Sequence, residues 1–280
     1  MSPEDPLSTA PADEAHEVVA GPPGTRFPEI RWYAETDSTN RCLADAARAG
    51  APEGLVVAAD HQRAGRGRLG RRWEAPPGRN LLVSVLLRPS LAAEHRHLCT
   101  AVVAMAAAEA CSRVADVEPA LKWPNDLVVG DRKLAGILAE VVGEEPAPAV
   151  VVGIGVNVGW PAPDGAPGEP PLPAELQGSA TSLWRACGRR HEPRAVLEAL
   201  LADLEPRVAA LATTEGRLAQ AAEFRRRCST IGATVRVELD GETVTGQALD
   251  VTPEGHLVVD VGACMRTIVA GDVVHLRPHA

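Results

Sequence analysis

The sequence predicts an α/β (α+β) protein in which a larger domain is followed by a small all-β domain. Apolar strand patterns alternate with helical patterns from Ile30 to Arg227, and only short strand patterns follow Cys228. With 280 residues, 45% of them apolar, the chain has room for one large and one small domain. The expected parts are a disordered acidic and proline-rich tail at 1–28, the large domain at 29–227 and the small domain at 228–280.

Composition and charge narrow the class of protein. The first twenty-five residues lack the basic start and apolar run of a secretory signal. The six cysteines are scattered without a C-x-x-C pair, which indicates reduced thiols in a cytoplasmic protein. The net charge of −9 argues against a surface that coats nucleic acid or adsorbs to membranes. The apolar stretch His97–Val114 contains Glu109 and Arg113, and we expect a helix too short and too polar to span a bilayer.

The first predicted helix follows three residues of capping type, Thr36, Asp37 and Ser38. It runs from Asn40 to Arg48, and Gly50 ends it. A long polar segment with many glycines and prolines, His61–Asn80, reads as a loop. The other predicted elements are strands at Leu55–Ala59, Leu81–Leu87 and Ala120–Trp123, a helix at His97–Val114, a hairpin of Leu127–Val129 with Leu134–Val142, and a strand at Ala149–Val158.

The later part of the chain changes character twice. Six prolines between Trp160 and Pro173 indicate a surface loop. Helical patterns then cover Thr181–Arg189 and Pro193 to about Arg227. The small domain is predicted from four short strands, Thr234–Glu238, Thr243–Asp250, His256–Asp260 and Met265–Ala270, separated by glycine-containing turns.

The loop contains the segment Gly65–Gly70, which formally matches G-x-G-x-x-G. A dinucleotide site is disfavoured because no helix opens at the third glycine and no acidic residue follows about twenty positions on. Five arginines lie within ten residues here: Arg63, Arg66, Arg68, Arg71 and Arg72. Clustered like charge favours an anionic ligand such as a phosphate, and we expect ligand to order the loop. A merely solvated loop and a nucleic-acid patch are the alternatives.

A second cluster contains the only two lysines of the chain, Lys122 and Lys133, eleven positions apart. If the predicted hairpin forms, both amines lie near one sheet and each could reach an anion. Asn125 and Asp126 follow Pro124 at a turn, where short polar side chains either cap the backbone or, for the carboxylate, serve as a general base or metal ligand.

Five ordered motifs together resemble those of the biotin-protein ligases. They are Thr36-Asp37-Ser38-Thr39-Asn40, Gln62 with Ala64-Gly65-Arg66-Gly67-Arg68, Lys122-Trp123-Pro124-Asn125-Asp126, Arg132-Lys133-Leu134-Ala135-Gly136, and Gly153-Ile154-Gly155-Val156-Asn157. The resemblance implies a class II synthetase-like mixed sheet flanked by helices, followed by an SH3-like barrel. It also implies activation of biotin by ATP with Mg²⁺ to biotinyl-5′-AMP and transfer to a lysine of a biotin carboxyl carrier domain.

The resemblance assigns roles to residues of this sequence. The catalytic set is Lys133, Arg68, Asp126 and Lys122; the biotin set is Ser38, Thr39, Asn40, Gln62, Arg66, Gly67, Arg68, Lys133, Gly136 and Gly155; the nucleotide set is Arg66, Arg68, Arg71, Trp73, Asn125, Lys133 and Asn157. Core packing is the alternative for Trp73. No resident protein metal site and no catalytic cysteine are expected.

Alternatives remain for the function. A lipoate-protein ligase shares the fold and the adenylation chemistry, and a nucleic-acid-binding or scaffolding protein is a different class. Because about thirty acidic, proline-rich residues precede the motifs, we expect a ligase without a DNA-binding domain and without membrane contact. The resemblance also allows a homodimer formed through an exposed edge of the main sheet, for which no residue of the sequence gives evidence.

Overall fold

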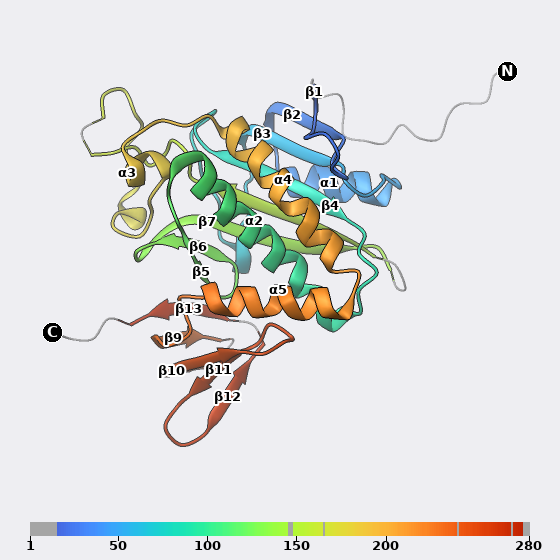
Figure 1. Ribbon diagram of the computed structural model, residues 1–280. Coiled ribbons are helices and arrows are strands. Elements are labelled where there is room, and N and C mark those ends of the chain that lie inside the picture. The colour runs from blue at the N-terminus through green and yellow to red at the C-terminus, as the bar shows by residue number, and fades with distance from the viewer. Residues whose placement is uncertain (1–15, 145–147, 165, 240, 270, 277–280) are drawn as a thin grey trace.

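The computed structural model has a large mixed-sheet domain and a smaller antiparallel sheet beneath it (Figure 1). The structure describes residues 16–144, 148–164, 166–239, 241–269 and 271–276. The predicted α/β class, with a mixed sheet flanked by helices and a separate C-terminal sheet, is confirmed.

The described strands of the main sheet lie in the order β1-β2-β3-β4-β8-β7-β6-β5. Strands β2 and β3 are parallel and all other neighbours are antiparallel. The central strands β4 and β8 are buried along their whole length, as their apolar sequences predict. The bounds are β1 His16–Ala20, β2 Glu29–Thr36, β3 Val56–Gln62, β4 Leu81–Leu87, β5 Ala120–Lys122, β6 Asp126–Val129, β7 Arg132–Val142 and β8 Ala149–Val156.

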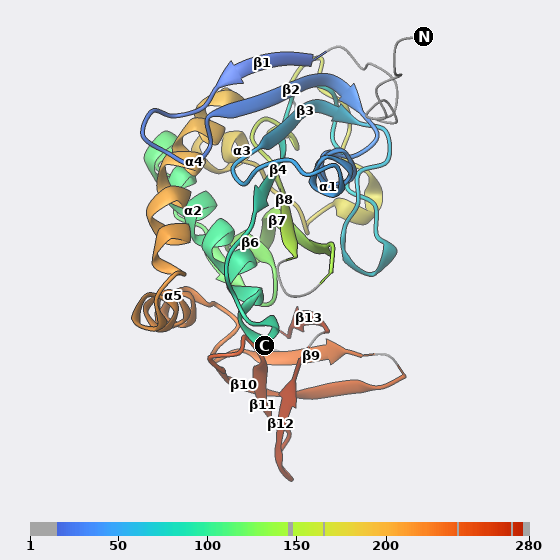
Figure 2. The same cartoon turned by 90° about the vertical axis from the view of Figure 1, so that its right-hand side faces the viewer.

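Helices cover both faces of this sheet (Figure 2), with α1 on one side and α2 and α4 on the other. Alternate residues of β3 point to opposite faces, so Val57 packs with Leu43 of α1 while Val56 joins the cluster that contains α2 and α4. The helix bounds are α1 Thr39–Arg48, α2 His97–Ala115, α3 Leu183–Cys187, α4 Pro193–Ala210 and α5 Thr214–Arg227. The predicted pattern from Pro193 onward is thus two helices, and Thr213 caps the second by accepting from the Gly216 N–H.

The expectation of a disordered tail at 1–28 is wrong for its second half. His16–Ala20 forms strand β1, which pairs antiparallel with β2 at the edge of the main sheet. Phe27 is fully buried in the main core. The backbone hydrogen bonds of the sheet edge and one large apolar side chain outweigh the polar composition here. Residues 1–15 lie outside the described residues.

Helix α2 corrects another expectation. Together with the turn before it, the segment Ala93–Ala115 has 23 residues and a mean hydropathy of 1.5, so it is long and apolar enough to cross a membrane by length and composition. Its apolar stretch is 72% buried inside the protein, where it packs against α4 and the sheet. The expectation that this helix is too short and too polar to span a bilayer is therefore wrong. Its apolar composition is explained by its burial in the core of the domain.

The C-terminal strands form an antiparallel sheet in the order β12-β11-β10-β9-β13 among the described residues. Strand β13, Asp272–His275, was not predicted because its segment is only four residues long, yet it pairs with β9 in register. The remaining bounds are β9 Thr234–Glu238, β10 Thr243–Val251, β11 Leu257–Asp260 and β12 Met265–Ile268. Ala270, the end of the last predicted strand, lies outside the described residues.

Candidate active site

A cavity of about 260 Å³ lies on the α1 side of the main sheet. It is enclosed by the start of α1, the arginine-rich loop and strands β7 and β8. Most of the residues predicted for the site line it: Ser38, Thr39, Asn40, Gln62, Arg66, Gly67, Arg68, Arg71, Trp73, Asn125, Asp126, Lys133, Gly136 and Gly155. Lys122 and Asn157 are not among the lining residues.

One end of the cavity is neutral and buried, and the first turn of α1 forms it. The Thr39 N–H donates to Gln62 Oε1 at 2.8 Å, which ties the helix start to the end of β3. Ser38 occupies the N-cap position but its side chain does not cap the helix. Ser38 is a buried residue that lines the cavity. The helix start therefore offers the cavity a hydroxyl that is not used as a cap, and this hydroxyl can bind a polar ligand.

The floor of the cavity consists of two glycines that are paired across strands. Gly136 of β7 lies opposite Gly155 of β8, and the indole of Trp73 lies on both. A Cβ atom at Gly155 would come within 2.4 Å of the indole, so only glycine leaves this space. Trp73 Nε1 is buried and has no hydrogen-bond partner within the described part of the chain. Trp73 is a cavity residue with an unused donor, which disfavours the core-packing alternative.

The arginine-rich loop contributes the charged end, and two of its arginines already pair with acidic side chains. Arg63 forms ion pairs with Glu35 and Asp37, each at 2.9 Å. Arg66 Nη2 donates to Glu140 Oε2 at 2.6 Å. These two arginines therefore do not require an anionic ligand to offset their charge, contrary to expectation, because acidic side chains from β2, its following turn and β7 supply the counter-charge.

Within the loop, the backbone folds back on itself through a bridge between Arg66 and Arg72. The Trp73 N–H donates to the Gly65 carbonyl at 3.0 Å, which brings the indole over the cavity. Arg68 Nη1 donates to Asn125 Oδ1 at 3.1 Å and to the Gly271 carbonyl at 3.3 Å, so it links the loop to the C-terminal domain.

Lys133 lies at the charged end as predicted. Its Nζ atom is 2.6 Å from Asp126 Oδ1 and 5.6 Å from the centroid of the Trp73 ring. Strand pairing places both partners, because Asp126 of β6 lies opposite Gly136 in β7. The Lys133 side chain is about two-fifths exposed and lines the cavity, so it is accessible to an anion there.

Lys122 and Asn157 are used elsewhere. Burial lowers the pKa of His275 in the C-terminal domain, and the nearby positive charge of Lys122 lowers that pKa further. Asn157 is buried; its Nδ2 donates to the Thr181 carbonyl at 2.9 Å, and its Oδ1 accepts from Asn80 at 3.1 Å. The structure thus places neither residue in the cavity, because protein contacts orient Asn157 and β5 carries Lys122 to the domain boundary.

Sequence reasoning missed two polar residues beside the cavity. Ser84 is fully buried in β4, and its hydroxyl donates to Asn40 Oδ1 at 2.6 Å. Glu140 of β7 accepts from Asn40 Nδ2 at 2.7 Å as well as from Arg66. One signal was available, since Ser84 is the one polar residue in the apolar run Leu81–Leu87.

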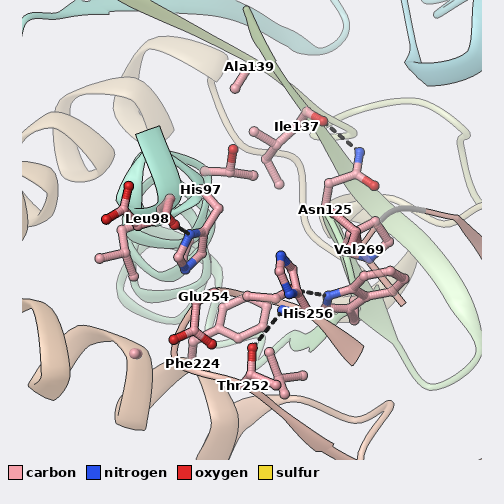
Figure 3. A pocket seen from close by; sticks show the side chains of 18 of the residues that line it. His97, Leu98, Asn125, Ile137, Ala139, Phe224, Thr252, Glu254, His256 and Val269 are labelled. Carbon is pink, nitrogen blue, oxygen red and sulfur yellow. Dashed lines mark hydrogen bonds between the residues drawn. The ribbon is translucent and has the colours of Figure 1, made fainter. Parts of the chain in front are cut away.

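A second cavity of about 370 Å³ lies between α2, α5 and the turn that follows β10 (Figure 3). His97, Glu254 and His256 surround it together with apolar side chains such as Phe224. Trp123 closes one wall and joins the domains, because its Nε1 donates to the Gly255 carbonyl at 2.8 Å. Of the predicted site residues, only Arg68 and Asn125 reach this cavity in the described structure.

Comparison with known proteins identifies the class of ligases to which this fold and the first cavity belong. Residues 32–157 match the Biotin/lipoate A/B protein ligase family, and residues 230–276 match the Biotin protein ligase C terminal domain. The chain is 37% identical over 260 residues to the biotin–acetyl-CoA-carboxylase ligase of Mycobacterium tuberculosis, covering 91% of each protein. It is 31% identical to the bifunctional ligase/repressor BirA of Bacillus subtilis, over 86% of this chain and 72% of that one.

A solved structure shows the same arrangement. The biotin protein ligase from Aquifex aeolicus in complex with biotin and ATP superimposes with a TM-score of 0.74 and 25% identity, over 89% of this chain and 99% of that one. This chain belongs to the biotin protein ligase family.

Proposed function

We propose that the protein activates biotin with MgATP and transfers the biotinyl group to a lysine of a carrier domain. In the first step a biotin carboxylate oxygen bonds to the α-phosphorus of ATP and pyrophosphate leaves. In the second step the acceptor amine attacks the acyl carbon, AMP leaves and the amine loses a proton. The carrying observation is one cavity with a neutral hydrogen-bonding end at α1 and a cationic end at Lys133.

The neutral end suits the ureido ring of biotin. A ureido group has two N–H donors and one carbonyl acceptor, so it needs both kinds of partner. Gln62 uses its Oε1 atom to accept from Thr39 and keeps its Nε2 protons for a ligand carbonyl. The Ser38 hydroxyl does not cap the helix, and a hydroxyl can both donate and accept a hydrogen bond.

The cationic end suits the two reacting anions. Arg66, Arg68 and Lys133 line this end, and together they offset the repulsion between the carboxylate and the α-phosphate. Glu140, Asn125 and Asp126 each contact one of the three cations and so help to place it at this end of the cavity. We assign Lys133 to the oxygens whose charge rises during adenylation.

Asp126 has two proposed tasks at the same point. It pairs with Lys133, and it is a carboxylate that can accept the proton of the acceptor amine during transfer. Among the described lining residues it is the only carboxylate. One carboxylate beside phosphates fits Mg²⁺ that enters with ATP, and no cluster of three or more potential metal ligands lies among the described residues.

We assign the nucleotide to the surface formed by Arg71, Trp73 and Asn125. The flat indole on its glycine floor offers a stacking face for adenine, and its buried N–H offers a donor. A contact of Asn157 with adenine, as predicted, would require Asn157 to break its present hydrogen bonds with Thr181 and Asn80. Its proposed role is therefore to hold the segment after β8 in place.

The acceptor and the cellular setting remain part of the proposal. The Mycobacterium tuberculosis relative is named for acetyl-CoA carboxylase, which supports a biotin carboxyl carrier domain as the acceptor. The cysteines at 42, 99, 111, 187, 228 and 264 are all free, which supports a cytoplasmic protein. We propose action without DNA or membrane contact. Any homodimer would use an exposed strand edge such as β1, and light scattering with and without ligands tests that.

Pyrophosphate release with MgATP and either biotin or lipoate tests the function. We expect release with biotin and none with lipoate, and transfer to a purified carrier domain should follow. Release with lipoate alone would favour lipoate ligation. If neither substrate caused pyrophosphate release, the result would favour the alternative of a nucleic-acid-binding or scaffolding protein.

A further inference from the structure

Arg68 of the arginine-rich loop is held where the two domains meet. Its Nη1 atom donates to Asn125 Oδ1 at 3.1 Å and to the Gly271 carbonyl at 3.3 Å. A guanidinium is planar and rigid, so two contacts at Nη1 set the direction of its other N–H groups. Both of these acceptors are neutral oxygen atoms, so the two contacts orient the cation without offsetting its charge. Arg68 also lines the ligand cavity, where the proposed function uses that charge.

The first acceptor, Asn125, is fixed by strand β7. Asn125 Nδ2 donates to the Ile137 carbonyl at 2.6 Å, and the Ile137 N–H donates to the Asn125 carbonyl at 2.9 Å. With Nδ2 bound to β7, Oδ1 is presented to the arginine-rich loop. The neighbouring Trp123 is tied to the C-terminal domain, because its N–H donates to Thr230 Oγ1 at 3.0 Å and its Nε1 donates to the Gly255 carbonyl at 2.8 Å.

The second acceptor, Gly271, is fixed by the C-terminal sheet. Gly271 is buried and directly precedes β13, which pairs with β9 from Asp272 onward. A Cβ atom at position 271 would lie 2.7 Å from Val237 Cγ1 and 2.9 Å from Leu239 Cδ2. Val237 is fully buried and β-branched, so it has little freedom to move aside. We therefore expect a side chain at position 271 to displace the start of β13 together with the carbonyl that Arg68 contacts.

We propose that Gly271 is a positioning residue for adenylation, and that the C-terminal domain acts through the Gly271 carbonyl to orient the Arg68 guanidinium toward the reacting anions. The inference rests on the proposed function, in which those anions are the biotin carboxylate and the α-phosphate of ATP. It gives the small domain a task in the first chemical step, although the described lining of the ligand cavity contains no residue of that domain.

Pyrophosphate release with biotin and MgATP, analysed as kcat and KM, tests the inference. Gly271→Ala moves the carbonyl and weakens a hydrogen bond to a charged group, so we expect kcat to fall about 10-fold. The KM for biotin should stay within about twofold of the original value, because the neutral end of the cavity is unchanged. A loss confined to the KM for biotin would contradict a role in orienting Arg68.

Gly262→Ala is the matched control, because it makes the same change in the same domain. Gly262 is exposed in the turn between β11 and β12 and has a φ of +83°, so alanine there is strained and costs stability. This variant should lower the thermal midpoint and leave kcat unchanged. An equal fall in kcat for both glycine variants would assign the effect to lost stability of the domain and overturn the inference.

A double-mutant cycle with Arg68 shows whether Gly271 acts through it. In an Arg68→Ala background, Gly271→Ala should cause no further loss of pyrophosphate release in a single turnover, because the group that it orients is gone. Equal losses in both backgrounds, or a Gly271→Ala rate equal to that of the original protein, would overturn the inference.

A backbone variant covers the case in which Gly271→Ala does not fold. An ester bond between residues 271 and 272 makes the Gly271 carbonyl a weaker acceptor and adds no Cβ atom, and we expect kcat to fall about threefold. An unchanged kcat in the ester variant would overturn the inference. No pyrophosphate release with biotin by the original protein would instead overturn the proposed function.

Discussion

Lys122 and Lys133 start from the same description in the sequence and end in different places. Both are lysines of neighbouring motifs, and both lie in the hairpin region formed by β5, β6 and β7. Lys133 reaches the cavity, where it pairs with Asp126 and lies 5.6 Å from the Trp73 ring. Lys122 lies at the domain boundary, close enough to His275 to lower its pKa.

The position of each strand explains the difference. Strand β7 pairs with the buried central strand β8, so its first residues face the cavity floor and the arginine loop. Strand β5 is the last strand of the sheet, and its backbone bonds to the segment that begins the C-terminal domain. Membership of a motif therefore indicates a neighbourhood in the fold, and strand order decides which side chain enters the site.

The largest expected effect is at Lys133. Lys133→Arg keeps the charge but replaces a compact ammonium with a wide planar group, so pyrophosphate release should fall about 100-fold to 1,000-fold. Arg132→Lys, a swap at its exposed neighbour, should leave the rate unchanged. Both variants should keep the thermal midpoint of the original protein. Near-normal release by Lys133→Arg would remove the distinction between the two lysines.

Asp126 sharpens the comparison by separating the two chemical steps. Asp126→Asn removes the carboxylate that holds Lys133 and that we assign as proton acceptor, so transfer to the carrier domain should fall about 100-fold. Adenylation should fall less, because Lys133 keeps its charge. Single-turnover measurement from purified biotinyl-5′-AMP isolates transfer from adenylation. An equal loss in both steps would limit Asp126 to positioning Lys133.

We expect an effect of intermediate size on the rate of trypsin cleavage in the arginine-rich loop. Trypsin cleavage between Arg63 and Arg79 should slow when biotin and ATP are added, because the loop contributes Arg66, Arg68 and Trp73 to the ligand cavity. Cleavage after Lys122 should not change under the same conditions, since Lys122 does not line that cavity. Unchanged cleavage at both places would argue against ordering of the loop by ligand.

The smallest expected effect is at Lys122. Lys122→Arg keeps the charge beside His275, and both kcat and the KM for biotin should stay within about twofold of the original values. Mass spectrometry after incubation with biotin and MgATP, without a carrier, gives a second comparison, and we expect little biotin on either lysine. A large fall in kcat for Lys122→Arg would restore Lys122 to the catalytic set.

Chemical modification of the cysteines is expected to have no effect on biotin ligation. Burial raises the pKa of the Cys99 and Cys111 thiols to about 12, so both stay protonated and inert at neutral pH. Cys264 is the exposed cysteine, and brief treatment with iodoacetamide should label it without loss of biotin ligation. Inactivation by the reagent would contradict a mechanism that uses no thiol.

Local sequence patterns were sufficient for the central part of the fold. Leu81–Leu87 forms β4 with the predicted bounds, because a run of large apolar residues between turns can only be buried on both faces. Edge elements were less accessible to such reasoning. Strands β1 and β13 are stabilised by pairing with β2 and β9, and that pairing cannot be read from their own segments of five and four residues.

By itself, the sequence determined which chemical groups the cavity would hold, since the ordered motifs contain the cation, the carboxylate, the hydroxyl groups and the glycines that line it. Tertiary structure decided which of them enter the cavity and in what state. It kept Lys122 out of the cavity, balanced Arg66 with Glu140, and placed the Ser84 hydroxyl within hydrogen-bond distance of Thr39. These contacts join residues 45 to more than 70 positions apart, and only the packing of distant strands brings such residues together.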